Sequence, residues 1–180
     1  MAAVAEANVA QDHALSSLAI NPLLFSAVKD SVENALGMCD TEIRCVGVSA
    51  MPTKESGMIT GMIGVHGKVS GFISVNMAER FVISAVEGLL QEKFGKLCSQ
   101  VIDGAGEITN IVVGGVKSAL GKSEFGFSHI TVPSIIVGQN FTIAYAPGLE
   151  YLTVTFEHVD ADAIRLEDRM MHVSMSLLTL

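Results

Sequence analysis

Charged residues are scarce in this chain. They make up 17% of its 180 residues, while hydrophobic residues make up 49%. An average soluble domain has about 25% charged residues. The apolar excess must therefore be buried in a large core, in a subunit interface, or in both.

Basic residues are the scarcest of the charged ones. The chain has 11 Lys and Arg against 19 Asp and Glu, which gives a net charge of −8. Phosphate contacts need clustered Lys and Arg, so nucleic acid is not expected as a partner. The histidines show no i, i+4 pair and the cysteines no C-x-x-C spacing. This spacing predicts no metal site in the chain. No cofactor of its own is expected for the chain.

Uninterrupted apolar runs and targeting signals are also lacking. The longest stretch without Asp, Glu, Lys or Arg is 125–149, and it contains two prolines and a polar Gly-Gln-Asn turn. Such a stretch suits paired strands better than a membrane span. The N-terminus has no basic region of the kind that begins a signal peptide. These features predict a cytoplasmic protein with no segment inserted in a membrane.

The hydrophobic periodicity predicts an N-terminal extension at 1–20 and one domain of mixed helices and strands at 21–180. Helices are expected at 21–37, after residue 76, at 97–120 and at 160–171. Strands are expected at 43–50, 58–65, 69–76, 127–132, 134–137, 141–145 and 151–158. The last residues, 172–180, fit either type of element.

Several expected helix ends carry capping residues. Asn21 suits the N-cap of the first helix, and the following proline suits its first position. Gly37 is expected to cap its C-terminus. Asn76 and Glu79 resemble a capping box at the start of the second helix, and Gly121 is expected to end the long third helix.

A weak internal repeat relates two of the helices. With an offset of 84 positions, 21–37 can be laid over 105–121. Residues identical at both ends of that offset are Val28, Val32, Ala35, Leu36 and Gly37. A duplicated half that pairs with its copy around one core would explain the apolar composition.

The long helix at 97–120 is expected to have two distinct faces. At 3.6 residues per turn, one side is apolar and is predicted to be core: Val101, Ala105, Ile108, Val112, Val116 and Ala119. The opposite side carries a narrow row that we call the polar stripe: Asp103, Glu107, Asn110, Gly114 and Lys117. Glu107 and Asn110 stand at i and i+3, so their side chains are neighbours.

Glycines inside this helix need an explanation. Gly104, Gly106, Gly114 and Gly115 each cost about 1 kcal/mol relative to alanine in a helix interior. They could serve helix packing inside the fold. Gly106 and Gly114 lie beside the Glu107–Asn110 pair, however, and bare backbone there would let another macromolecule approach closely. This arrangement favours a docking face.

The segment from Asp103 to Leu120 resembles the signature helix of the CheC/CheX/FliY phosphatases. That signature is Asp or Ser, then Glu four residues later, then Asn three residues beyond. The CheX branch is matched by Ile20-Asn21-Pro22, by the strand 71–75 and by the run 133–138. The resemblance covers about 20–160 and implies an α+β, CheC-like domain with a pseudo-twofold repeat, in which an antiparallel or mixed sheet packs against helices.

The resemblance also implies a function. These proteins dephosphorylate the chemotaxis response regulator CheY, whose own domain holds the aspartyl phosphate and the Mg²⁺. Glu107 would pair with a Lys of the regulator, and Asn110 would aim a water at the phosphorus. Asp103, Gly106, Gly114 and Lys117 would contact the partner.

The repeat limits the number of such sites. In the overlay, Glu107 falls on Leu23 and Asn110 on Ser26, so one site per chain is expected. CheX relatives form homodimers, which implies a homodimer here. Two alternatives remain open at this point: a CheX-like module that binds a receiver domain without catalysis, and a structural domain whose glycine-rich helix merely packs.

Overall fold

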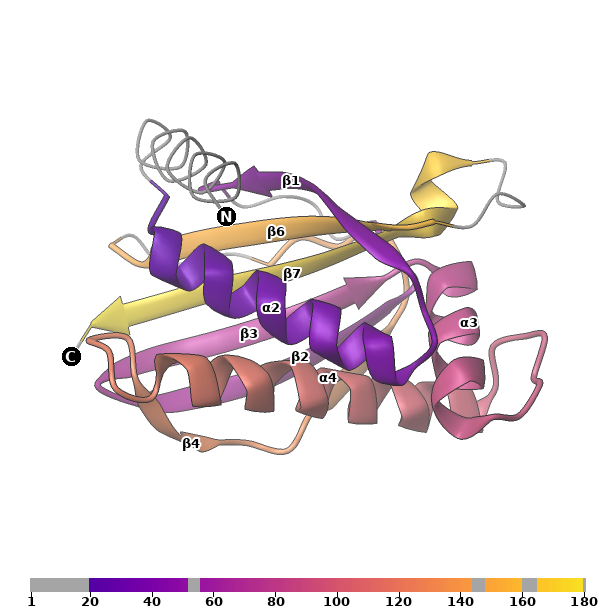
Figure 1. The fold of residues 1–180 in the computed structure, drawn as a ribbon, viewed down its shortest axis with the longest axis horizontal. Helices are drawn as coiled ribbons and strands as arrows, with labels where there is room; N and C mark the ends of the chain where they lie inside the picture. Colours follow the sequence, from indigo (N-terminus) through magenta and orange to yellow (C-terminus); the bar gives the residue numbers. More distant parts are fainter. Residues whose placement is uncertain (1–19, 52–55, 144–147, 160–164, 180) are drawn as a thin grey trace, which may run out of the picture.

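Two long helices, α2 (Pro22–Met38) and α4 (Ser99–Leu120), lie side by side across one face of an antiparallel sheet (Figure 1). A shorter helix, α3 (Glu79–Leu90), lies near the N-terminal end of α4. The computed structural model describes residues 20–51, 56–143, 148–159 and 165–179. The expected extension at 1–20 lies outside these residues except for Ile20.

The sheet has the strand order β1-β6-β7-β3-β2-β4, and β5 also pairs with β2. Every pair is antiparallel. The strands are β1 (Ile43–Ser49), β2 (Ile59–Gly67), β3 (Val69–Met77), β4 (Phe127–Ile130), β5 (Ser134–Val137), β6 (Glu150–His158) and β7 (Met170–Thr179). A 3₁₀ turn, η1 (Leu166–Arg169), leads into β7.

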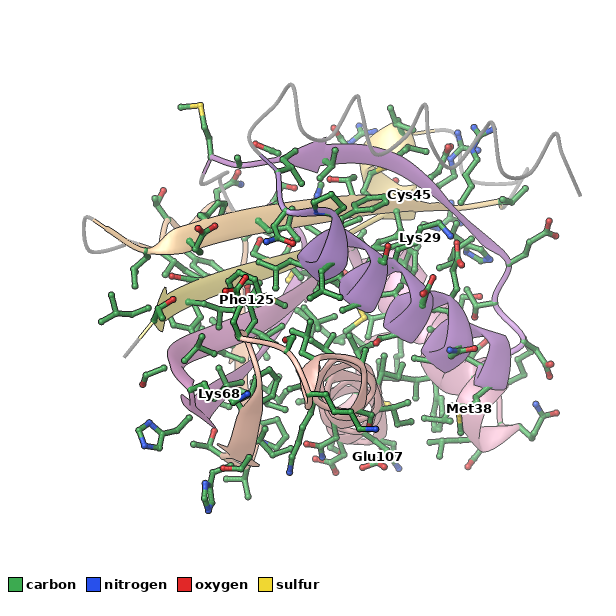
Figure 2. The ribbon with its side chains drawn as sticks, turned by 60° about the vertical axis from the view of Figure 1, so that its left-hand side comes forward. Lys29, Met38, Cys45, Lys68, Glu107 and Phe125 are labelled. Atoms are coloured by element: carbon green, nitrogen blue, oxygen red, sulfur yellow. The ribbon has the colours of Figure 1, made fainter. Side chains whose placement is uncertain are left out.

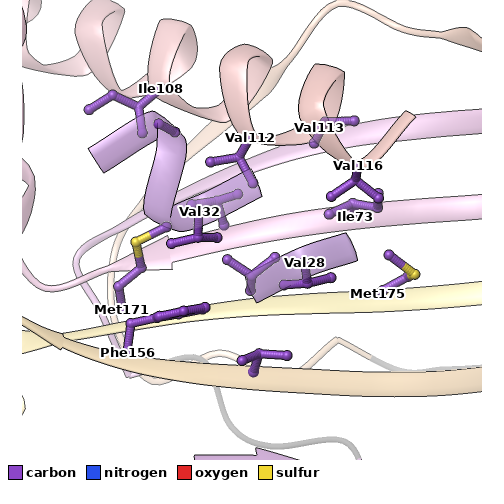
Figure 3. Packing of buried hydrophobic residues seen from close by; sticks show 14 of the residues in the cluster. Val28, Val32, Ile73, Ile108, Val112, Val113, Val116, Phe156, Met171 and Met175 are labelled. Atoms are coloured by element: carbon purple, nitrogen blue, oxygen red, sulfur yellow. The ribbon is translucent and has the colours of Figure 1, made fainter. Parts of the chain in front are cut away.

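The pairing pattern confirms the duplicated halves that the repeat predicts. The halves meet at the centre of the sheet, where β3 pairs with β7. Each half also supplies an edge to the other, because β1 pairs with β6 while β4 and β5 pair with β2. Equivalent positions of the two long helices reach the same core (Figure 3), where Val28, Val32, Val112 and Val116 are fully buried.

The caps of α2 and α3 are a mixture of confirmed and wrong predictions. The Asn21 side chain accepts hydrogen bonds from the Leu23 and Leu24 amides, at 2.9 and 3.4 Å. Gly37, in contrast, lies inside α2, and the left-handed conformation beyond the helix is taken by Asp40 (φ 49°).

The capping box at Asn76 is wrong. This side chain is buried, where its oxygen accepts from the Gly57 amide (2.8 Å) and its nitrogen donates to Thr60 Oγ1 (2.7 Å). The N-cap of α3 is Ala78, which makes no side-chain cap bond. A buried amide must satisfy its hydrogen bonds, and here it does so with the neighbouring strand.

The second half differs most from expectation near the C-terminus. The helix expected at 160–171 is wrong, because 166–169 form a single 3₁₀ turn and β7 begins at Met170; 160–164 lie outside the described residues. Residues 172–179 belong to a strand. Of the strand expected at 141–145, Phe141 forms an isolated bridge, and 144–145 lie outside the described residues. Across the described ranges, no helix is long and apolar enough to cross a membrane.

The connection between α3 and α4 is tied by one carboxylate. Glu87 Oε1 accepts from the backbone amides of Phe94 (2.8 Å) and Gly95 (2.7 Å), and its Oε2 pairs with Lys93 Nζ (2.9 Å). The bond from Gly95, together with the Lys93 contact, lowers the pKa of the Glu87 carboxyl. This tie fixes the loop that delivers the chain to the start of α4.

We predict that Glu87→Gln lowers the stability of the protein relative to wild type, and that this loss is larger at pH 7 than at acidic pH. A carboxyl whose pKa is lower in the folded protein adds stability above its unfolded pKa, about 4.3 for Glu. That stability is lost as the pH falls through the folded value. Melting temperatures of both proteins from pH 7 to pH 3 check this, with Glu92→Gln, an exposed neighbour, as control. A deficit of constant size over this range contradicts the prediction.

Candidate functional site

The rotation of α4 about its axis is set by a close approach to β2. Thr109 is fully buried, and its hydroxyl donates to the Ala105 carbonyl (2.7 Å) one turn earlier. It sits directly over Gly61, where a β-carbon would overlap Thr109 Oγ1. Glycine at 61 therefore lets the helix rest on the strand, and this contact turns the opposite side of α4 toward solvent.

Two of the helix glycines hold α4 against the other helices. A β-carbon at Gly104 would lie 2.5 Å from Val86 Cγ1 on α3, and one at Gly115 would lie 2.9 Å from Ser31 Cβ on α2. Both distances are too short for ordinary packing. Packing inside the fold, rather than docking, explains these two glycines.

The polar stripe faces outward, as predicted. Asp103 and Glu107 are exposed, and Asn110, Gly114 and Lys117 are half-buried. Figure 2 looks down α4 and shows Glu107 at the outer surface of that helix. The apolar side of α4 is buried as expected except at its end, where Ala119 is exposed.

The two glycines beside the pair differ from each other. At Gly114 a β-carbon would meet nothing within 4 Å, so the backbone is open to an approaching molecule. Gly106 is buried, and its β-carbon would lie 3.8 Å from Pro133 and 3.7 Å from Ile135. The prediction of bare, accessible backbone is correct for Gly114 and wrong for Gly106, because Ile135 of the edge strand β5 and Pro133 just before it cover Gly106.

That edge strand supplies neighbours of the site that the helix periodicity could not reveal. Pro133 and Ile135 pack against Gly106, and Val132 beside them is 82% exposed. The available signal was the absence of any charged residue from 125 to 149. That absence predicted paired strands, but it did not indicate that they lie against α4.

The stripe has the chemistry of a site that acts on a partner. In the described part of the chain, neither the Glu107 carboxylate nor the Asn110 amide has a hydrogen-bond or ion-pair partner. The carboxylate can bind a cation, and the amide can both accept from and donate to a water. The stripe itself has no thiol, imidazole or hydroxyl group that could form a covalent intermediate.

Other reactive groups are poorly suited to take part. Burial raises the pKa of the Cys39 thiol to about 11, and burial also raises the pKa of Cys45. Such thiols are poor nucleophiles at neutral pH. Among the residues that the structure describes, no three His, Cys, Asp or Glu side chains are grouped as metal ligands.

The equivalent face of α2 lacks the pair. Leu23 is 44% exposed and Ser26 is exposed, at the positions that the overlay assigns to Glu107 and Asn110. Burial of Glu107 and Asn110 would favour the alternative of a merely packing helix. Since Glu107 is exposed and Asn110 half-buried, the geometry disfavours that alternative.

Comparison with known families agrees with this geometry. The sequence model described as chemotaxis phosphatase CheX matches residues 59–157, which span β2 to β6 and include the whole polar stripe. No curated protein matches the chain.

Solved structures of similar fold include a CheC-like superfamily protein from Shewanella sp. PV-4 (TM-score 0.73, 23% identity, 88% of this chain and 99% of that one). The chemotaxis protein CheX from Vibrio vulnificus has a TM-score of 0.72 and 23% identity, over 86% of this chain and 99% of its own. A third is the CheX–CheY–BeF₃–Mg²⁺ complex from Borrelia burgdorferi, with a TM-score of 0.66 and 21% identity over 86% of this chain and 95% of the other.

We predict opposite effects of alanine at two adjacent glycines of α4. Gly114→Ala should raise the free energy of unfolding by roughly 0.5–1 kcal/mol, because nothing obstructs its β-carbon. Gly115→Ala should lower it by about 1 kcal/mol or more, because the new carbon meets Ser31. Urea unfolding of the two variants and wild type measures both changes. Equal stabilisation by both variants contradicts the described contact between α2 and α4.

Proposed function

Because this chain belongs to the chemotaxis phosphatase CheX family, we propose that its polar stripe dephosphorylates the aspartyl phosphate of a CheY-like response regulator. The observation that carries the proposal is the pair Glu107 and Asn110. These side chains stand one helical turn apart on a solvent-facing surface, and neither has a partner among the described residues. The relative from Borrelia burgdorferi, solved with CheY, BeF₃ and Mg²⁺, supports a receiver domain as the partner.

In this proposal Glu107 sets the docked pose. Its exposed carboxylate would pair with a lysine of the receiver domain. A charge pair that closes at an interface becomes stronger as water leaves, and it fixes the register of the two surfaces. Asp103, one turn earlier on the same face, adds negative charge beside this pair.

Asn110 would position the attacking water. The water oxygen forms a bond to phosphorus while the bond from phosphorus to the aspartyl oxygen breaks. The electron pair of that bond leaves with the aspartate carboxylate, and the phosphoryl group is released as dihydrogen phosphate, which keeps both hydrogens of the water. The amide accepts one hydrogen of the water and holds its oxygen in line with the leaving group, so catalysis rests on positioning.

A neutral amide suits this position. The receiver domain would bring the phosphorylated aspartate and the Mg²⁺, and a carboxylate at 110 would compete with the phosphoryl oxygens for that positive charge. An amide orients the water without adding a charge. We propose that this chain supplies no metal of its own, and that Gly114 and Lys117 complete its contact surface, with Gly106 beneath the edge of that surface.

A second candidate is capture of the receiver domain without catalysis. It uses the same face, and it differs from the first proposal in one respect: the partner's rate of phosphate release is unchanged on binding. The homodimer implied by the resemblance and the cytoplasmic location expected from the sequence stay predictions.

We predict that Asn110→Ala and Glu107→Ala separate catalysis from binding. Asn110→Ala should lower the rate of phosphate release at saturation by about 10²-fold or more, with binding retained. Glu107→Ala should weaken binding by roughly 2 kcal/mol or more, because it leaves a cation of the partner unpaired. Release of phosphate from phosphorylated CheY with Mg²⁺ and a binding titration measure the two effects.

The matched control is Asn34→Ala, which removes an exposed amide from α2 and should leave both measurements unchanged. Wild-type activity in Asn110→Ala contradicts the catalytic role. If wild-type protein binds the receiver but does not accelerate phosphate release, the non-catalytic candidate is correct.

We predict that Gly114→Leu blocks docking while the fold is retained. The open space at this position accommodates a side chain in the free protein, and helix propensity should raise stability by roughly 0.5 kcal/mol. A leucine on the contact surface would hold the partner away, which should raise Kd by more than about tenfold.

The control is Gly37→Leu, at a second helical glycine with nothing within 4 Å of its β-carbon, on α2. It should leave the affinity unaltered. Unchanged affinity in a folded Gly114→Leu protein contradicts contact of this face with the partner.

A further inference from the structure

Residues 131–133 link β4 to β5, which follow one another along β2, and this link exposes an apolar side chain to solvent. Two hydrogen bonds to Gly64 hold Thr131 in place. Its amide donates to the Gly64 carbonyl (3.0 Å), and its hydroxyl accepts from the Gly64 amide (3.0 Å). Pro133 then interrupts the edge strand, because proline has no amide hydrogen to donate. Val132, between these two anchors, is 82% exposed, more than any other large hydrophobic residue of the described chain.

This link lies beside the polar stripe. Pro133 and Ile135 pack against Gly106, which precedes Asn110 by four residues and therefore lies on the same side of α4. The link thus borders the stripe on the side where Asn110 lies. Glu107 lies farther around the helix, toward the side of α2.

The edge beside the stripe is unusually apolar for a free sheet edge. No residue from Ile130 to Val137 is charged, and the exposed fractions are 36% for Ile130 and 51% for Val137. Proteins commonly protect such edges with charged side chains. An exposed apolar patch without them marks a surface that another molecule covers.

We propose that the link Thr131–Pro133 is a second contact for the receiver domain, and that Val132 forms an apolar rim beside Asn110. This inference rests on the proposed function. A water held by Asn110 at an open helix face would exchange with bulk solvent, and contacts that surround a polar interaction gain their value by excluding solvent. Because the link borders the side of α4 on which Asn110 lies, one partner can cover both. The partner surface would then present an apolar area next to its cation.

The test compares aspartate at two exposed valines. Val132→Asp should raise the Kd for CheY activated with BeF₃ and Mg²⁺ by about tenfold or more, since a charge replaces a buried apolar contact. Val132→Ser should raise it less. The control is Val46→Asp, at a valine 44% exposed on β1 at the opposite sheet edge, and it should leave Kd unchanged. Thermal melts of all variants check that the fold is retained.

Photo-crosslinking identifies the molecule that covers the link 131–133. A benzophenone amino acid at position 132 should crosslink to the activated receiver. A crosslink to a second copy of this chain, or a wild-type Kd in folded Val132→Asp, overturns the inference while the proposed function stands. If wild-type protein does not bind the activated receiver at all, the proposed function fails first.

Discussion

The close approach of α4 to its three neighbours governs the rest of the structure. Thr109 rests on Gly61 of the sheet, Gly104 on α3, and Gly115 on α2. At each contact one partner has no side chain, so the helix comes nearer than ordinary residues allow. Glycine costs about 1 kcal/mol per position in a helix, and that cost is offset by the burial that close packing permits. Three contacts on three sides leave α4 one orientation, and the polar stripe faces outward as a consequence.

The two halves of the fold share the inner contact between their long helices but differ on the outer faces of those helices. Gly115 of α4 meets Ser31 of α2, and the repeat assigns these residues to equivalent positions. The helices thus pack through the same position of each half, on the axis that relates them. The outer faces are under no such constraint, and they differ: Leu23 and Ser26 stand where α4 has Glu107 and Asn110. A single site per chain is compatible with a core built twice.

Local patterns in the sequence predicted what depends on neighbours along the chain. The Asn21 cap, the two faces of α4 and the exposure of Glu107 follow from helix geometry alone, and the structure confirms them. Features that depend on distant segments were not predictable in this way. Asn76 has the sequence context of a capping box but bonds to β2, and Gly106 lies on the polar side of α4 but is covered by the edge strand. The helix predicted to end at 171 does not extend there, because Met170 and Met171 begin β7, which pairs with β3 and β6 at the centre of the sheet.

A carboxylate and an amide on a rigid helix cannot hydrolyse a phosphate alone. The stripe has no thiol, imidazole or hydroxyl group, and it is not joined to a group of metal ligands in the described residues. If the proposed function holds, the reacting groups come from two proteins and meet only when the surfaces close. The close packing of α4 on three sides would then serve the reaction, because a water must be held to within a fraction of an ångström of its line of attack. The proposed rim at Val132 follows from the same reasoning, because a site assembled at an interface has to be sealed from water by the residues around it.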